Sequence, residues 1–167
     1  MRILLSSLRR SQSGTAAAEM ALVTPLLIAI LFGAFELGNF FYSEHVVAKA
    51  VRDGARYASR RSFSDYPGCA PVQDVIDRTR YITRTGQVTS GGPTRIRGWT
   101  ADATVTVSVT CDTSGTYLGI YKGLAGGVRV VTVSAAVPYT SLFGTIGIGT
   151  GNSLILNAQS QAPVMGI

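Results

Sequence analysis

The chain has few charged residues. Only 14% of its 167 residues are charged and 46% are hydrophobic, against roughly 25% charged residues in ordinary soluble domains. The shortage is local, because between Met20 and Tyr42 the only ionisable side chains are Glu36 and Tyr42 itself. A membrane segment explains this unevenness better than a generally apolar core. The length allows one ordinary domain, with a little chain left over for an anchor.

Histidine is nearly absent, which argues against an enzyme. The single histidine, His45, follows Glu44 at the end of the apolar run, where a lone histidine is usually a solvated side chain. No Ser-His-Asp set and no metal-ligand cluster can be assembled around it. The glycines of segment 147–151 look like a phosphate loop, but the Lys-Ser/Thr ending is missing. We therefore expect no enzymatic activity, no cofactor and no metal.

The net charge of +6 does not indicate a nucleic-acid partner. The arginines are scattered, and basic and aromatic residues do not interleave as they do in proteins that bind single strands. Three of the arginines (Arg2, Arg9 and Arg10) lie in the first 14 residues, a short basic stretch without acids that we interpret as a leader. There they serve membrane topology and not ligand binding.

Cysteine is limited to Cys69 and Cys111, which both follow the apolar run. In an oxidising compartment they would pair, close a loop of roughly 40 residues and contribute about 2–4 kcal/mol to stability. The alternative is two unrelated buried thiols. We favour the disulfide on the condition that this part of the chain is exported.

The apolar run from Met20 to Tyr42 predicts a transmembrane helix. It has about 23 residues and would be about 34 Å long, enough to span a bilayer core. Pro25 lies inside it and should kink the helix, which transmembrane helices tolerate. Beyond the run, small and apolar residues recur at helical spacing (Val47, Ala50, Val51, Gly54 and Ala58), with Lys49, Arg52, Arg56 and Arg60 on the other side. We therefore predict one continuous helix over residues 15–61.

The remaining residues, 62–167, predict a small head domain. A turn-rich linker (62–71) precedes a helix that ends at Gly86, in which Val72, Val75, Ile76 and Ile82 have helical spacing. Alternating residues then predict three strands, at 103–111, 128–139 and 152–162. The predicted fold class is α+β: a long N-terminal transmembrane helix followed by a small α+β head with an antiparallel sheet.

The junction between the leader and the helix is the most informative feature. Gly14 is followed five residues later by Glu19, directly before the apolar run. A glutamate at the head of a membrane helix is expensive to insert and needs a reason. One reading is that Glu19 lies near the helix N-terminus, where the helix dipole favours an acid. That reading explains a tolerated glutamate, but it does not explain the placement after a glycine and a basic leader.

Four motifs follow one another along the predicted helix: GTAAAE (14–19), ALVTPLL (21–27), FGAFELG (32–38) and AVRDGARYA (50–58). Together they resemble type IV prepilins and, more narrowly, the TadE-like minor pseudopilins of tight-adherence (Flp) pilus systems. The resemblance is strong over residues 14–58, and the head resembles that family only in its layout.

The resemblance implies processing and assembly. A prepilin peptidase would cleave after Gly14 and leave Thr15 as the new N-terminus. Glu19, then the fifth residue, would neutralise the terminal amine of a neighbouring subunit, because unpaired charges in a membrane cost several kcal/mol each. Pro25 and Glu36 would belong to the same assembly helix. For Glu36, an interfacial carboxylate that reaches water remains as good an interpretation as a contact with a partner helix.

The resemblance also implies a minor pilin that takes part in pilus assembly, and so in surface adhesion or secretion. It would be a single-pass protein of the inner (cytoplasmic) membrane, with its C-terminal domain in the periplasm or within a pilus. Its partners would be the prepilin peptidase, other pilin-like subunits and pilus assembly proteins.

Two alternatives to this interpretation stay open, and the sequence speaks against a third. More cations follow the apolar run than precede it, so a simple positive-inside count would place the C-terminus in the cytoplasm. An uncleaved single-pass envelope protein whose periplasmic domain binds a ligand or partner would have the same layout. An ordinary secreted protein needs a small-residue cleavage site just past the apolar run, and the nearest match, at 48–50, lies too far downstream among charges.

Overall fold

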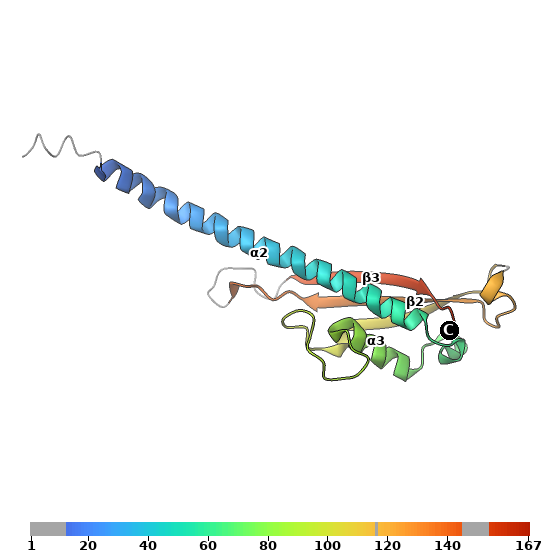
Figure 1. The fold of residues 1–167 in the computed structure, drawn as a ribbon. Coiled ribbons are helices and arrows are strands. Elements are labelled where there is room, and N and C mark those ends of the chain that lie inside the picture. The colour runs from blue at the N-terminus through green and yellow to red at the C-terminus, as the bar shows by residue number, and fades with distance from the viewer. Residues whose placement is uncertain (1–12, 116, 145–153) are drawn as a thin grey trace, which may run out of the picture. The chain divides into compact units, whose positions relative to one another are not determined.

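The structure is a computed structural model that describes residues 13–115, 117–144 and 154–167. Its main elements are the helices α2 (Ser13–Ser59) and α3 (Gln73–Thr85) and the strands β1 (Val105–Asp112), β2 (Val128–Pro138) and β3 (Ile155–Pro163) (Figure 1). Four short 3-10 helices connect them: η1 (Phe63–Asp65), η2 (Pro67–Cys69), η3 (Asp102–Thr104) and η4 (Gly119–Tyr121). This order confirms the predicted α+β fold class. The leader residues 1–12 and the glycine-rich segment 147–151 lie outside the described residues.

The long helix α2 has 47 residues and continues through Pro25 without a break. It ends in a tightened turn, in which the N–H groups of Arg60 and Arg61 donate to carbonyls three residues earlier. Ser62 then leaves the helix, and its hydroxyl accepts a hydrogen bond from the N–H of Ser64 to cap η1. We predicted a helix over residues 15–61, and the observed bounds differ by two residues at each end.

The chain forms two compact units, Met1–Gly38 and Asn39–Ile167, and the boundary between them falls inside α2. We expected the head to begin at residue 62. The compact unit begins earlier because residues 39–59 of α2 carry part of the head's own core. We call residues 13–38 the N-terminal half of α2, and residues 39–59 its C-terminal half.

The three strands form one antiparallel sheet in the order β1-β2-β3. In the register, Val107 lies opposite Val133, and Val133 lies opposite Ser160. The inward side chains of β2 are fully or almost fully buried, whereas the outward face of the sheet carries hydroxyl and amide side chains such as Thr106 and Gln159. Alternation in the sequence therefore predicted the inner face of β1 correctly, and the three predicted strands lie within three residues of the observed bounds.

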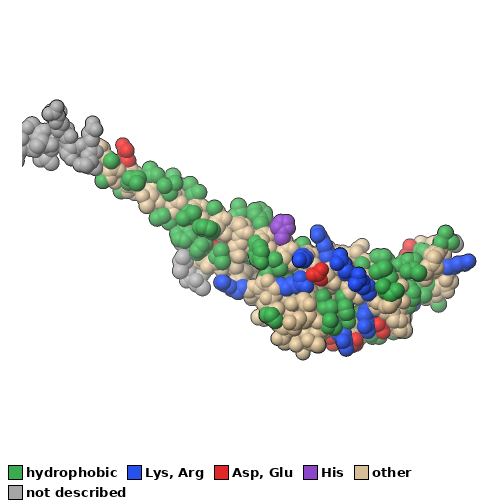
Figure 2. Space-filling model, in the orientation of Figure 1, with side chains coloured by type: hydrophobic (Ala, Val, Ile, Leu, Met, Phe, Trp, Pro, Cys, Tyr) green, Lys and Arg blue, Asp and Glu red, His purple; other side chains and the backbone are tan. Residues whose placement is uncertain are grey.

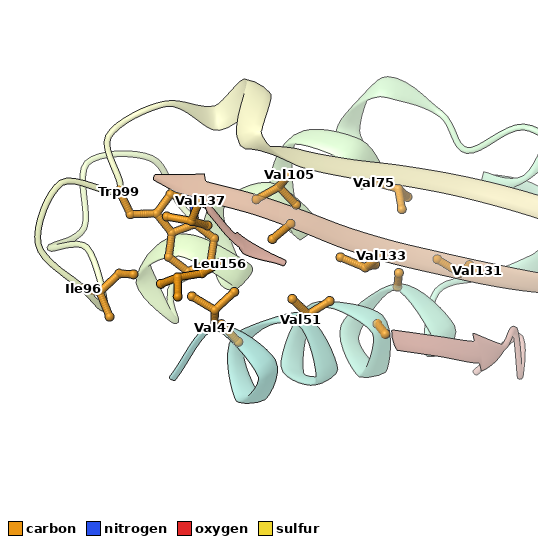
Figure 3. Packing of buried hydrophobic residues seen from close by; sticks show 14 of the residues in the cluster. Val47, Val51, Val75, Ile96, Trp99, Val105, Val131, Val133, Val137 and Leu156 are labelled. Carbon is orange, nitrogen blue, oxygen red and sulfur yellow. The ribbon is translucent and has the colours of Figure 1, made fainter. Parts of the chain in front are cut away.

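The core of the head lies between the inner face of the sheet and the C-terminal half of α2. Figure 3 shows Val47 on the helix near Leu156 and Trp99, and Val51 one turn further along the helix below β2, which carries Val133 and Val131. These four valines are at most 1% exposed. Trp99, the only tryptophan, is fully buried in the same cluster, and its indole N–H donates to the hydroxyl of Thr104.

The helix α3 approaches α2 most closely at Gly54. A Cβ atom at position 54 would lie 2.2 Å from Oγ1 of Thr83 and 3.5 Å from Cγ2 of Thr79. Both threonines are fully buried. From the sequence we expected the inner face of α3 to consist of Val72, Val75, Ile76 and Ile82; of these, Val75 is fully buried and the other three are half-buried. The hydrophobic spacing did not indicate Thr79 and Thr83, because threonine carries a polar hydroxyl. Their methyl groups nevertheless pack in the core.

A disulfide joins η2 to the sheet, and the C-terminal segment is hydrogen-bonded to the end of α2. Cys69, at the end of η2, is bonded to Cys111 on β1 with a Cα–Cα distance of 6.0 Å. After β3 the chain returns to the end of α2, where the N–H of Met165 donates to the carbonyl of Ser59 at 2.7 Å. The hydroxyl of Tyr66, which is fully buried, donates to the carbonyl of Ala58 at 2.5 Å. The end of α2 is therefore held by segments that are distant in the sequence.

Candidate membrane and assembly site

The N-terminal half of α2 exposes large apolar side chains all round. Every residue from Gly14 to Leu31 is exposed, including Leu22 at 80% and Met20 at 67%. Soluble monomers rarely expose a continuous apolar patch above a few hundred Å². By length and composition this helix can cross a membrane, and the window that meets this test is not buried by the described chain. The predicted transmembrane helix is therefore present as an unburied apolar helix.

The single hydroxyl deep in this run has a partner inside the helix. Oγ1 of Thr24 donates to the carbonyl of Met20 at 2.6 Å. A hydroxyl bonded to the preceding turn can enter an apolar medium without the penalty of an unpaired donor. Pro25, which lacks an N–H, directly follows. The polar interruption at Thr24–Pro25 is thus compatible with lipid around the helix.

The predicted cleavage junction lies in the first turn of α2. Gly14 and Thr15 are exposed, and no heavy atom lies within 4 Å of the position that a Cβ on Gly14 would take. First turns of helices fray readily, so a protease can reach such a peptide bond more easily than one in the middle of a helix. Cleavage between these residues stays a prediction.

Glu19 is exposed and lies beyond the first turn of α2, which contains no acidic residue. The stabilising effect of the helix dipole falls off within the first turn. Removal of residues 1–14 would start the helix at Thr15 and still leave Glu19 beyond that turn. The geometry therefore weakens the interpretation that Glu19 is simply a carboxylate favoured by the helix end.

The helix does not bring the three predicted assembly residues together on one face. Pro25 and Glu36 lie about 16 Å apart along the axis and only about 20° apart around it, whereas Glu19 is rotated by about 100–120° from both. Glu36 is half-buried, unlike Glu19. Glu19 and Glu36 therefore present their carboxylates to different neighbours. A role in assembly would require contacts on two sides of the helix.

Asn39 marks the point at which α2 joins the head unit, and sequence reasoning missed it. Its side-chain amide donates to the hydroxyl of Tyr139 at 2.8 Å. The ring of Phe40 packs edge-on against Tyr139, with 5.3 Å between centroids, while Phe41 and Tyr42 stay exposed. In the sequence Phe40, Phe41 and Tyr42 stand together at the end of the apolar run, but the structure gives them two different environments. The polar Asn39 directly before them was the available signal that one side of the helix already packs on protein.

The described part of the chain offers little for catalysis. Among these residues no group of three His, Cys, Asp or Glu side chains is close enough to hold a metal ion. The hollow on the outer face of the sheet is lined by small and uncharged side chains, among them Thr106, Ser134 and Gln159. Such a lining contains no general acid or base.

Comparison with known protein families finds a similarity that lies in α2. Residues 14–56 match the family described as TadE-like protein. Over these residues the helix is similar to TadE-like proteins. The match confirms the resemblance inferred from the four sequence motifs and covers nearly all of α2 but none of the sheet. No curated protein and no solved structure matches the chain.

The TadE-like segment is longer than the apolar run. It continues to residue 56, through Val47, Val51 and Gly54, which pack in the head. The matched pattern therefore contains both an exposed apolar helix and the beginning of the head's core. A membrane requirement alone explains only the first of these two parts.

Proposed function

We propose that this chain is a minor pilin-like subunit that takes part in assembly of a tight-adherence (Flp, type IV-like) pilus, and so in surface adhesion or secretion. The observation that carries the proposal is the TadE-like match over a helix whose membrane-length apolar window is not buried by the described chain. Such a helix needs lipid, other helices or both as neighbours. Subunits that assemble through membrane helices have this requirement.

In this proposal a prepilin peptidase cleaves after Gly14, and Thr15 becomes the N-terminus. Glu19 then pairs with the terminal amine of a neighbouring subunit in the membrane, and the helix face that carries Pro25 and Glu36 contacts other pilin-like helices or assembly proteins. An exposed carboxylate in the second turn supports this role because it has to find a cation in a medium of low dielectric constant.

We further propose that the protein crosses the inner membrane once, with its head in the periplasm. The Cys69–Cys111 disulfide supports this orientation, because disulfides persist in oxidising compartments such as the periplasm. The cations that follow the apolar run do not oppose it strongly, since they belong to a helix that packs into a folded head. Whole domains are translocated largely regardless of their charge.

Replacement of Glu19 by Gln tests the assembly role. The change keeps the size of the side chain and removes only its charge. We expect the variant to insert, to be cleaved after Gly14 and to lose crosslinks in whole cells to the pilin-like subunits that wild type contacts. Glu44→Gln is the matched control, because it makes the same chemical change at an exposed position of the same helix beyond the apolar run.

Equal crosslinking yields from wild type and Glu19→Gln, with normal processing in both, would contradict the pairing role. They would favour the rival function, an uncleaved or separately anchored envelope protein whose head binds a ligand or partner. A variant that fails to insert would be compared with Glu19→Asp, which keeps the charge.

A further inference from the structure

A row of cations lies along the exposed side of the C-terminal half of α2. It consists of Lys49, Arg52 and Arg56 on the helix and Arg60 in the turn that directly follows, which we call the basic stripe, and all four are exposed. Their spacings of three, four and four residues place them within an arc of about 80° around the helix axis and spread them over about 16 Å along it. Figure 2 shows Lys and Arg side chains gathered over this part of α2, close to the single histidine.

The basic stripe is not part of the head's packing. Val47, Val51 and Ala58, which pack on the sheet, project from the opposite side of the helix. In the part of the chain that the structure describes, ion pairs to aspartates involve Arg61, Arg78, Arg80, Arg84 and Arg95, and none involves a stripe residue. Four like charges on one helix face repel one another. An acidic partner would relieve this repulsion.

A second copy of this chain does not supply such a partner. Five of the head's aspartates already pair with its own arginines: Asp53, Asp65, Asp74, Asp77 and Asp102. A sixth, Asp112, accepts hydrogen bonds from Ser114. The chain as a whole has 15 Lys and Arg residues against 9 acidic residues. Glu44, which is exposed and takes part in none of these ion pairs, is the one other acidic residue of the head unit, so a second copy offers no row of free carboxylates to the stripe.

A bilayer surface also fits the stripe poorly. Measured along α2 from Tyr42, where the apolar run ends, Lys49 lies about 10 Å away and Arg60 about 27 Å away. The attraction of charged headgroups falls off within a Debye length, about 8–10 Å at ordinary ionic strength. Only the Lys49 end of the stripe would therefore be attracted to the charged headgroups of a membrane next to Tyr42. The length and straightness of the stripe fit an elongated protein surface better than a membrane surface.

We propose that the basic stripe docks an acidic, elongated face, such as a helix with regularly spaced carboxylates, on a different protein of the assembly. The proposal rests on the proposed function in taking that partner to be another pilus component. It is independent of Glu19, which lies on the other half of α2. Charge complementarity at such a face would select the partner and speed its encounter.

The test is photo-crosslinking in whole cells that express the full chain. A photoreactive residue replaces His45, which is exposed, lies in the same arc as the stripe and leaves all four cations intact. We expect a crosslink to a protein whose reacted segment is acidic. The variant Arg52→Glu/Arg56→Glu should lower its yield at least tenfold, because like charges then face each other. Reversal of two partner carboxylates to Lys should restore it.

The matched control is Lys122→Glu, since Lys122 is an exposed cation of the head outside α2 that forms no ion pair in the described structure. It should leave the crosslink unchanged. Fluorescence of buried Trp99 and the intact disulfide show that each variant folds. Cleavage after Gly14 and crosslinks from the N-terminal half of α2 report on the proposed function separately.

A crosslink that survives charge reversal would overturn the proposal, as would one that maps to a segment without acids or one that is absent. The proposal would also be overturned if charge-reversed stripe variants of the purified full chain lost binding to vesicles of phosphatidylglycerol while the crosslink in cells was kept. That result would assign the stripe to lipid.

Discussion

The two halves of α2 are one helix in two different environments. In the N-terminal half apolar residues occur all round, and the window long enough to span a membrane is not buried. In the C-terminal half one face packs into the head, with Ala50, Val51 and Ala58 fully buried, and the other face carries the basic stripe. The boundary between the two compact units, at Gly38 and Asn39, separates these patterns.

The difference lies in size and distribution as much as in hydrophobicity. The packed face of the C-terminal half uses small residues, which let the sheet and α3 come close, as at Gly54. The N-terminal half presents Leu, Ile, Met and Phe in every direction, and a helix that is apolar all round needs neighbours on every side. One half is thus completed by its own chain, and the other needs lipid or partner helices.

Loss of the disulfide should have the largest effect, and only on the head. The Cys69–Cys111 bond spans 42 residues of sequence, for which loop-closure entropy predicts roughly 4 kcal/mol of stabilisation. Replacement of both cysteines by Ser should lower the unfolding temperature of the detergent-extracted protein, followed by Trp99 fluorescence. Insertion of the N-terminal half into membranes should not change. Equal unfolding temperatures for the variant and wild type would show that the bond does not stabilise the head.

The second largest effect should come from Gly→Ala substitutions in α2. The added methyl group should lower the stability of the head in the C-terminal half of the helix but not in the N-terminal half. Gly54→Ala places a Cβ 2.2 Å from Oγ1 of Thr83 and should destabilise the head by about 1–3 kcal/mol. Gly33→Ala meets nothing within 4 Å and should leave head stability unchanged. Urea unfolding of both variants measures the difference.

The clash at Gly54 can be checked with a double-mutant cycle. Thr83→Ala removes Oγ1, so Gly54→Ala should cost less in that background than in wild type. If the two variants add without interaction, the close approach of α3 to α2 is wrong. If Gly33→Ala destabilises the head as much as Gly54→Ala, the division of α2 into two environments is wrong as well.

Substitution of Tyr66 should have the smallest effect on the stability of the head, and this effect should depend on pH. Burial raises the pKa of its hydroxyl well above the usual range, and the neighbouring charge of Asp65 adds to this. Above about pH 10 the unfolded chain releases this proton while the folded chain keeps it, so the free energy of unfolding should fall by up to about 1.4 kcal/mol per pH unit.

Tyr66→Phe should remove that slope and cost about 1 kcal/mol at neutral pH, because the carbonyl of Ala58 loses its donor. Denaturant unfolding between pH 8 and pH 11 measures both quantities. Tyr42→Phe, at an exposed tyrosine near the junction, is the control and should change neither. An unchanged slope in Tyr66→Phe would assign the alkaline loss of stability to other groups.

The sequence predicted the parts of this fold that have regular periodicity. Val47, Val51 and Ala58 on α2, and the alternating valines of β1, lie on the inner faces that their spacing indicated. The apolar run was equally clear, because Glu36 and Tyr42 are the only ionisable side chains between Met20 and Tyr42.

Other features depend on residues that are distant in the sequence, which local patterns do not report. The packing of Thr79 and Thr83 at Gly54 and the hydrogen bond from Asn39 to Tyr139 are of this kind. The spacing of Cys69 and Cys111 likewise allowed a disulfide without requiring it. The candidate site could be predicted from the sequence at Gly14 and Glu19 because their spacing is itself the signal, and it stays a prediction. The rotation of Glu19 away from Glu36 follows from the continuous helix.

The central claim is that α2 begins as the membrane helix of a processed, pilin-like subunit. The most direct measurement is the intact mass and N-terminal peptide of the protein extracted from membranes of cells with an active prepilin peptidase. The account predicts a chain that begins at Thr15, and a Gly14→Val variant that accumulates in the longer form. Recovery of wild-type protein that still carries Arg9 and Arg10 would contradict it.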